Sequence, residues 1–187
     1  MTYIKRYKTN DDFSDILLSS DGTYLTGLWF EGSYDDEKLN HNYEEKDLKI
    51  FDETKKWLDI YFSGKEPCFT PKYKIENLSC FRKIITDILI KIPYGKTVTY
   101  NDIAKEVAKI KGIKKMSDQA VGVAVGKNPI CIIIPCHRVV GKNGNLTGFG
   151  GGLKNKIGLL KIENNDMENF FIPKKGNKLW KDACGVI

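Results

Sequence analysis

The sequence predicts a mixed α/β (α+β) protein built from two domains. Charge is divided along the chain, because residues 1–78 carry 11 Lys and Arg against 16 Asp and Glu, whereas residues 79–165 carry 15 against 5. Strand-like and helical patterns alternate in the acidic part, and short helical patterns dominate the basic part. An extended, proline-containing stretch over residues 65–77 separates them. We therefore expect domains at 1–78 and 79–165, followed by a tail at 166–187.

Two patterns define the acidic part. The apolar runs at 16–18 and 23–29 flank Ser20-Asp21-Gly22, a tripeptide typical of turns, so we expect a β-hairpin. Farther along, apolar residues recur at helical spacing over residues 51–62, and Gly64 stands where such a helix ends. The acidic part should therefore hold an antiparallel pair of strands and a helix with a buried face.

Three helical segments are predicted in the first half of the basic part. Apolar residues lie on one face of a helix over residues 79–92, which Pro93 interrupts. Thr99 and Asp102 form a capping box ahead of a second short helix, and after a lysine-rich loop Ser117 caps a third. The last two helices predict a helix-turn-helix motif, although the turn is longer than usual.

The second half of the basic part combines a strand, a turn and a glycine-rich loop. Residues 130–134 are a continuous apolar run, which predicts a buried strand, and residues 141–145 predict a hairpin turn behind it. Pro135-Cys136 ends that strand, where proline restricts the backbone and holds the sulfur at the edge of the core. Residues 148–152, four of them glycine, allow close backbone approach to a ligand and lead into a helix that reaches Glu163.

The composition indicates a soluble, cytoplasmic protein. No stretch approaches the ~18 apolar residues of a membrane span, and the N-terminus lacks the apolar stretch of a signal peptide. The five cysteines are an odd number without a C-x-x-C pair, which fits a reducing compartment. The basic part suits a polyanion, because Lys and Arg contacts to phosphate supply most non-specific nucleic-acid affinity; a solvated basic face is the alternative. We expect a monomer without membrane contact.

Cys136 is a candidate nucleophile. A thiol reacts as its thiolate, so it needs a neighbouring base or positive field that lowers its pKa from about 8.5. His137 follows directly, but adjacent residues of a strand point to opposite faces, which favours contact through a water. Glu163 is a candidate to orient the imidazole. The alternative is that Cys136 is an unreactive, packed core residue.

Metal and phosphate sites are weaker interpretations. Cys131, Cys136 and His137 are potential zinc ligands, but the chain has only one other histidine and no paired ligand motif, so we expect no metal. Gly95-Lys96-Thr97 is similar to the end of a phosphate-binding loop, but Ile90 stands where that motif needs a glycine. Cys136 remains the candidate reactive group.

Several motifs of the basic part resemble those of the O6-alkylguanine-DNA alkyltransferases. They occur in that family's order and spacing, and they are Tyr94-Gly95-Lys96-Thr97-Val98-Thr99-Tyr100, Ala120-Val121-Gly122, Asn128-Pro129, Ile134-Pro135-Cys136-His137-Arg138-Val139, Thr147-Gly148-Phe149-Gly150-Gly151-Gly152-Leu153, and Leu159-Leu160 with Glu163. The resemblance covers about residues 79 to 163. It implies a small N-terminal α/β domain with an antiparallel, ribonuclease H-like sheet and a C-terminal winged-helix-like domain that holds both the helix-turn-helix and the active site.

The resemblance implies DNA repair by self-alkylation. Such a protein flips O6-alkylguanine out of duplex DNA and transfers the alkyl group irreversibly to its own cysteine, here Cys136, in a single turnover; O4-alkylthymine is a second candidate substrate. His137 would activate Cys136 through a water, with Glu163 behind it. Tyr100 would crowd the phosphate of the flipped nucleotide and help to protonate the leaving base. Asn128 would hold the recognition helix against the active-site segment.

The same resemblance assigns contacts to the base and to DNA. Backbone groups of Cys136, Val139 and Gly150 would read the guanine edge, Phe149 would line the pocket, and Arg138 would support the fold around the site. The residues that would contact DNA are Tyr100, Gln119, Ala120, Gly122, Lys127 and Arg138. The expected partner is therefore double-stranded DNA that contains an alkylated guanine, and no cofactor or metal is implied.

Three positions depart from the family pattern. Gln119 stands where the family usually has an arginine that inserts into the base stack from the minor groove, and a neutral, shorter side chain stabilises that gap less. Phe149 replaces a common tyrosine, so the pocket lacks a hydroxyl. Ile162 replaces the usual histidine before Glu163. These departures concern DNA affinity and substrate range rather than the alkyl acceptor.

Three other functions compete with self-alkylation. A non-catalytic, alkyltransferase-like lesion-binding protein has tryptophan at the acceptor position, where this chain has Cys136. A helix-turn-helix regulator fused to a metal-bearing sensor needs a longer chain and clustered cysteines. A cysteine hydrolase needs an oxyanion site and a histidine that contacts the sulfur directly.

The tail at 166–187 has no assigned role. It contains Phe170, Phe171, Trp180 and Cys184. Such a segment either docks on the body of the protein or is partly disordered, and the sequence leaves both alternatives open.

Overall fold

A four-stranded sheet forms the N-terminal part of the computed structural model, which describes residues 1–33 and 42–172. Strands β1 (Thr2–Tyr7), β2 (Ile16–Ser20) and β3 (Leu25–Phe30) are antiparallel, and β4 (Tyr43–Glu45) runs parallel to β1, in the order β3-β2-β1-β4. The β2–β3 hairpin confirms the predicted one. Strand β1 was not predicted, and it pairs with β2 on the side away from β3.

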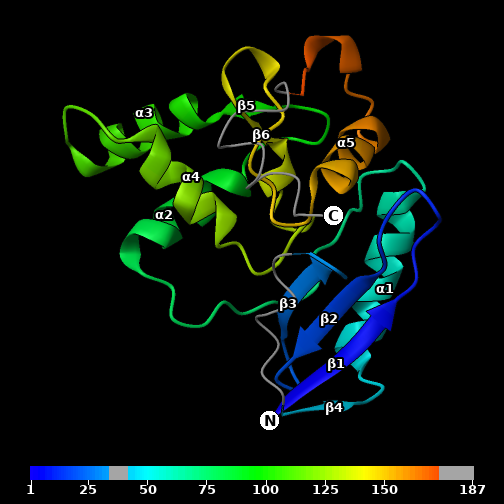
Figure 1. The fold of residues 1–187 in the computed structure, drawn as a ribbon. Helices are drawn as coiled ribbons and strands as arrows, with labels where there is room; N and C mark the ends of the chain where they lie inside the picture. The colour runs from blue at the N-terminus through cyan, green and yellow to red at the C-terminus, as the bar shows by residue number, and fades with distance from the viewer. Residues whose placement is uncertain (34–41, 173–187) are drawn as a thin grey trace.

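Helix α1 (Lys49–Phe62) lies against this sheet in Figure 1. Its buried face carries Phe51, Trp57, Leu58 and Tyr61, which confirms the amphipathic helix predicted from spacing. Beyond Gly64 the chain is extended and runs beside β3, where the main chain of Leu25 exchanges hydrogen bonds with Lys72 and Lys74 at 2.9 Å each. The stretch predicted to separate the two parts therefore also adds to the edge of the sheet.

Helices α2 (Cys80–Leu89), α3 (Tyr100–Lys111) and α4 (Asp118–Gly126) form the first half of the basic part. Thr99 and Asp102 form the predicted capping box, and Ser117 accepts the predicted hydrogen bond from the amide of Ala120. Gly112 ends α3 with a left-handed φ of 62°, so α3 includes the first three residues of the predicted lysine-rich loop, Lys109 to Lys111. Helices α3 and α4 pack on each other and on α2, as the helix-turn-helix prediction requires.

The strand predicted at 130–134 is wrong. Its only sheet contact in the described part of the chain is a bridge to β3, in which the amide of Leu28 donates to Pro129 and that of Cys131 to Leu28. The chain then turns tightly, with Ile132 at a left-handed φ of 68°, and Cys136–Arg138 form one turn of 3-10 helix, η2. An apolar run indicates burial but does not distinguish a strand from a buried turn. Consequently Cys136 and His137 are not on opposite faces of a strand.

The predicted turn after Val140 exists, but the predicted hairpin is wrong. The amide of Gly141 donates to the carbonyl of Asn145 at 2.7 Å, which closes a loop around the short helix η3 (Lys142–Gly144). Strand β6 (Val139–Val140) nevertheless pairs in parallel with β5 (Val98–Thr99), which immediately precedes α3. This pairing fixes the start of α3 beside the segment that carries Cys136.

Helix α5 (Leu153–Ile162) follows the glycine-rich loop, and Glu163 caps its C-terminal end. The short helix η4 (Met167–Asn169) comes next, and the amide of Phe171 donates to the carbonyl of Gly144 at 3.1 Å. The tail therefore docks on the body as far as residue 172. Trp180 and Cys184 lie outside the described residues.

The acidic and basic parts share one core. In Figure 1 the sheet and α1 form the lower part of the molecule, and α2 to α5 with β5 and β6 form the upper part. Phe30 and Leu58 from below belong to the same buried apolar cluster as Val107 and Ile134 from above. Within the described ranges, no helix has the length and hydrophobicity that crossing a bilayer requires.

Candidate active site

Cys136 lies at the first residue of η2, with 5% of its surface exposed. The side-chain amide of Asn128 donates to Sγ of Cys136 at 3.0 Å and to the carbonyl of Ile134 at 2.9 Å. Its oxygen accepts from the amide of Ile130 at 3.1 Å. Because one buried amide holds both the turn and the sulfur, the position of Sγ is set by the fold, and a donor at Sγ favours the thiolate.

His137 is fully buried behind Cys136 and faces Glu163. Its Nε2 lies 2.8 Å from Oε1 of Glu163 and 3.3 Å from the hydroxyl of Tyr61. An ionised carboxylate only accepts hydrogen bonds, so the proton of the neutral imidazole sits on Nε2 and Nδ1 keeps its lone pair. Among the described residues, no group hydrogen-bonds to Nδ1. That nitrogen is therefore free to accept a proton.

Glu163 is the centre of a buried hydrogen-bond cluster. Its Oε1 accepts from Tyr61 at 2.7 Å and from Nη2 of Arg138 at 2.9 Å, in addition to His137. Its Oε2 accepts from Nε of Arg138 at 3.0 Å and from the amide of Gly95 at 3.1 Å. Every lone pair of the carboxylate thus faces a donor, which is what keeps a buried charge tolerable.

The environment fixes the protonation states of this cluster. Burial raises the pKa of Glu163, but the hydrogen bonds and charges of His137 and Arg138 outweigh burial and lower the pKa to about 2. Burial lowers the pKa of His137 below its ordinary value, against the opposing pull of Glu163. At neutral pH the cluster therefore holds an ionised glutamate, a charged arginine and a neutral histidine that is able to act as a base.

Arg138 is 8% exposed and its hydrogen bonds go inward. Besides Glu163, its Nη1 donates to the carbonyl of Ile92 at 2.6 Å. Of its two predicted roles, support of the fold around the site and contact with DNA, this geometry favours the first, because the guanidinium already has protein acceptors.

Tyr100 begins α3 and reaches the glycine-rich loop. Its hydroxyl donates to the carbonyl of Gly148 at 3.1 Å. Burial, followed by the charge of Cys136, raises the pKa of Tyr100, so the hydroxyl stays protonated. A β-carbon at Gly148 would lie 3.1 Å from that hydroxyl, and Gly122 of α4 faces the same ring. The structure thus brings Tyr100, the loop and α4 together beside Cys136.

Lys156 is a fully buried lysine that the sequence interpretation missed. From α5 its Nζ donates to the carbonyls of Val139 at 2.6 Å and Thr147 at 3.1 Å, which joins β6 to the glycine-rich loop. Burial lowers its pKa to about 8, against the opposing effect of Cys136. A lysine on the buried face of a predicted helix is the signal that would have found it.

Phe149 lies in the glycine-rich loop and is 7% exposed. Its ring packs edge-on against Phe30, with ring centroids 6.3 Å apart, and a β-carbon at Gly151 would clash with both rings. Val139 is buried and Gly150 is half-buried. Glycine at 151 is therefore required for the two rings to approach.

The predicted DNA contacts of α4 lie on an accessible face. Gln119 is exposed, Ala120 and Gly122 are half-buried, and Val123 is 57% exposed. Lys127 is exposed beyond the helix, and its carbonyl accepts from Arg82 at 3.0 Å. After Asp118, which is exposed in its first turn, helix α4 presents neutral side chains to solvent, and lysines flank it.

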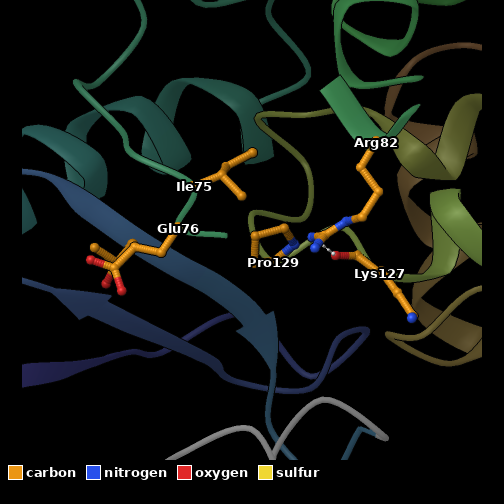
Figure 2. Close-up of a pocket in the computed structure, with 6 residues that line it drawn as sticks. Ile75, Glu76, Arg82, Lys127 and Pro129 are labelled. Carbon is orange, nitrogen blue, oxygen red and sulfur yellow. Dashed lines mark hydrogen bonds between the residues drawn. The ribbon is translucent and has the colours of Figure 1, made fainter. Parts of the chain in front are cut away.

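A separate pocket lies where the two parts meet (Figure 2). Its volume is about 410 Å³, and its lining residues are Thr26, Ile75, Glu76, Arg82, Lys127 and Pro129. Of the predicted site residues only Lys127 belongs to it. Within the described ranges, no group of three or more His, Cys, Asp or Glu side chains is arranged to hold a metal ion.

The chain is similar to several known proteins. Residues 80–165 match the family model for the 6-O-methylguanine DNA methyltransferase, DNA binding domain. The chain is 40% identical over 154 residues to the methylated-DNA–protein-cysteine methyltransferase of Methanosarcina mazei, which covers 82% of this chain and 92% of that protein. The crystal structure of the Mycobacterium tuberculosis O6-methylguanine methyltransferase is similar, with a TM-score of 0.73 and 32% identity over 87% of this chain and 93% of that one. The same organism's OGT in complex with DNA is similar with a TM-score of 0.73 and 29% identity, over 90% and 94%.

Proposed function

Because the chain belongs to the family of O6-methylguanine DNA methyltransferases, we propose that it repairs DNA by transferring an alkyl group from O6 of guanine to Sγ of Cys136. The observation that carries this assignment is the hydrogen bond from Asn128 to Sγ beside a neutral, carboxylate-bound His137. A thiol between a fixed donor and a base is poised to react as its thiolate. The non-catalytic alternative is not favoured, because the acceptor position holds cysteine.

The proposed reaction is a displacement at the alkyl carbon. Cys136 loses its thiol proton through a water to Nδ1 of His137, and Glu163 stabilises the imidazolium from the other side. The thiolate then forms an S–C bond while the O6–C bond breaks, and the bonding electrons leave with guanine. Tyr100, kept protonated by burial, donates a hydrogen bond or proton to the departing base. The thioether product is a poor leaving group, so each molecule acts once.

Base flipping is part of the proposal. Cys136 is only 5% exposed. An alkyl group on a base that is still stacked inside the duplex therefore does not reach its Sγ. Extrusion of the nucleotide costs a few kcal/mol of stacking and pairing. We assign the pocket to Val139, Phe149 and Gly150, and the DNA contacts to the face of α4 with Gln119.

The domain boundaries and the location complete the proposal. The family match over residues 80–165 supports a division into an N-terminal structural domain at 1–78, an alkyltransferase domain at 79–165 and a tail at 166–187. The five cysteines, with no paired motif, support action in the reducing cytoplasm.

Mass spectrometry tests the assignment directly. After incubation with duplex DNA that contains O6-methylguanine, we expect one added methyl group on the peptide that bears Cys136, and none in Cys136→Ser. Cys131→Ser removes a second buried sulfur five residues away and is the matched control, which should still transfer. An unmodified Cys136 peptide, transfer that persists in Cys136→Ser, or a steady multiple-turnover rate would contradict the proposal.

A further inference from the structure

A tyrosine of the N-terminal part reaches the proton-accepting side of the site. Tyr61 lies near the end of α1 and is 1% exposed. Its hydroxyl donates to Oε1 of Glu163 at 2.7 Å and lies 3.3 Å from Nε2 of His137, although Glu163 is 102 residues away in the sequence. The N-terminal part therefore contributes a polar group to the cluster behind Cys136.

The hydroxyl of Tyr61 makes hydrogen bonds within the cluster, and its ring makes packing contacts. The ring stacks on Trp57 at a centroid distance of 5.4 Å and meets Tyr94 edge-on at 6.0 Å, and phenylalanine would keep both contacts. A buried hydroxyl is costly unless it finds a partner, so packing alone would favour phenylalanine here. The partner it finds is the oxygen that His137 also uses.

Sharing of that oxygen has a chemical consequence. Oε1 of Glu163 faces four hydrogen-bond donors, namely the Tyr61 hydroxyl, Nε2 of His137, and Nε and Nη2 of Arg138. A donor that takes part of the carboxylate's charge leaves less of it to stabilise an imidazolium. Tyr61 thus fixes the orientation of Glu163 and acts in the same direction as burial, which disfavours the imidazolium of His137.

We propose that Tyr61 is a positioning residue of the alkyl-transfer reaction, through which the N-terminal part sets the basicity of His137 by sharing Oε1 of Glu163. The inference rests on the proposed function, in which His137 accepts the thiol proton. Tyr61 does not touch the reacting atoms and acts through Glu163.

Several ionisable groups surround His137 and have to be considered together. Glu163 at the end of α5 favours the imidazolium, whereas Arg138 of η2 and Lys156 of α5 disfavour it. Tyr61 of α1 faces Nε2 directly. Of these groups, Tyr61 is the one whose hydroxyl can be deleted without a change of net charge or of ring packing.

Tyr61→Phe is the experiment. We expect the single-turnover rate constant of methyl transfer to fall about tenfold on its plateau, because Glu163 loses a hydrogen bond that fixes its orientation behind His137. We expect the ascending limb of the pH–rate profile, which reports His137, to move upward by about half to one pH unit. The His137 ring, followed by NMR, should titrate at a correspondingly higher pH. Because the chain has two histidines, a His41→Gln variant assigns the signals.

Tyr7→Phe is the matched control. The hydroxyl of Tyr7 donates to Asp59 of the same helix at 2.8 Å, so this variant also deletes a tyrosine–carboxylate bond on α1, but outside the cluster. We expect it to leave the plateau rate, the pH profile and the His137 titration unchanged.

Three results would overturn the proposal. The first is a Tyr61→Phe variant with unchanged kinetics. The second is a variant whose rate falls without an upward shift of the His137 titration, and the third is a variant that no longer unfolds cooperatively. Either of the last two results would assign the hydroxyl to folding alone. If the unsubstituted protein adds no methyl group to Cys136, the proposed function fails instead, while the His137 titration still decides the role of Tyr61.

Discussion

The two sides of Cys136 differ in how many of their polar groups already have hydrogen-bond partners within the protein. Behind the sulfur, Asn128, His137, Arg138 and Glu163 are all buried, and most of their polar atoms already have protein partners. On the side that we propose to contact DNA, Gln119 and Lys127 of the α4 region are exposed to solvent.

This difference predicts where substitutions matter. Buried polar groups lose several kcal/mol when a partner is removed, because the remaining group is left desolvated and unpaired. Exposed groups contribute only when phosphate is near, and salt weakens that contribution. The buried side is therefore preorganised for chemistry, whereas the exposed side is adjustable.

Glu163→Gln should have the largest effect. It leaves the buried guanidinium of Arg138 without its counter-charge, which costs about 3–5 kcal/mol and lowers Tm by about 10 °C for a chain of this size. The exposed carboxylate of Glu168 supplies the control, and Glu168→Gln should stay within about 0.5 kcal/mol. Thermal melting at pH 7 measures both, and equal melting temperatures of the two variants would remove the distinction between buried and exposed charge.

The same substitution has a defined pH dependence. Since the pKa of Glu163 is lowered to about 2 in the folded protein, its ionised form stabilises the fold above its ordinary pKa of 4.5, and this contribution is lost as pH falls toward 2. The stability difference between the protein and Glu163→Gln should therefore shrink by about 3 kcal/mol over that window. Urea unfolding at several pH values measures it, and a constant difference would contradict the lowered pKa.

Lys156→Met should have an intermediate, pH-dependent effect. The pKa of Lys156 is lowered from 10.5 to about 8, so the unfolded chain binds more protons between these values and the stability of the protein rises with pH there. Methionine removes that rise, so the protein should gain about 3 kcal/mol relative to Lys156→Met between pH 8 and 10.5. Lys161→Met, an exposed change on the same helix, should show no such difference. Parallel unfolding curves for both variants would contradict a buried lysine.

Gln119→Arg should have the smallest effect and acts only on the exposed side. We expect tighter binding to duplex DNA and faster repair by a few-fold, since one exposed charge contributes about 1 kcal/mol or less. Gln119→Lys adds the same charge without the planar guanidinium, so it separates insertion from simple attraction. Binding and single-turnover rates at equal salt measure both, and an unchanged rate in Gln119→Arg would defeat the expectation.

Local signals in the sequence predicted much of the fold correctly. The capping box of Thr99 and Asp102, the cap at Ser117 and the helical spacing over residues 51–62 depend on neighbours within a few residues, and each is found in the structure. The run at 130–134 failed, because an apolar run reports burial but not backbone conformation, and the turn at Ile132 depends on contacts with β3 and Asn128.

The chemistry of Cys136 and its partners His137 and Glu163 could be named from residue types and order, together with the resemblance of their motifs to a known family. Only the tertiary structure placed Tyr61 and Lys156 around them, because neither lies in those motifs and both act through groups distant in the chain. The sequence by itself therefore identified the candidate reactive groups. The packing of α1 and α5 decided how those groups are charged, since burial and shared hydrogen bonds depend on contacts that no local pattern encodes.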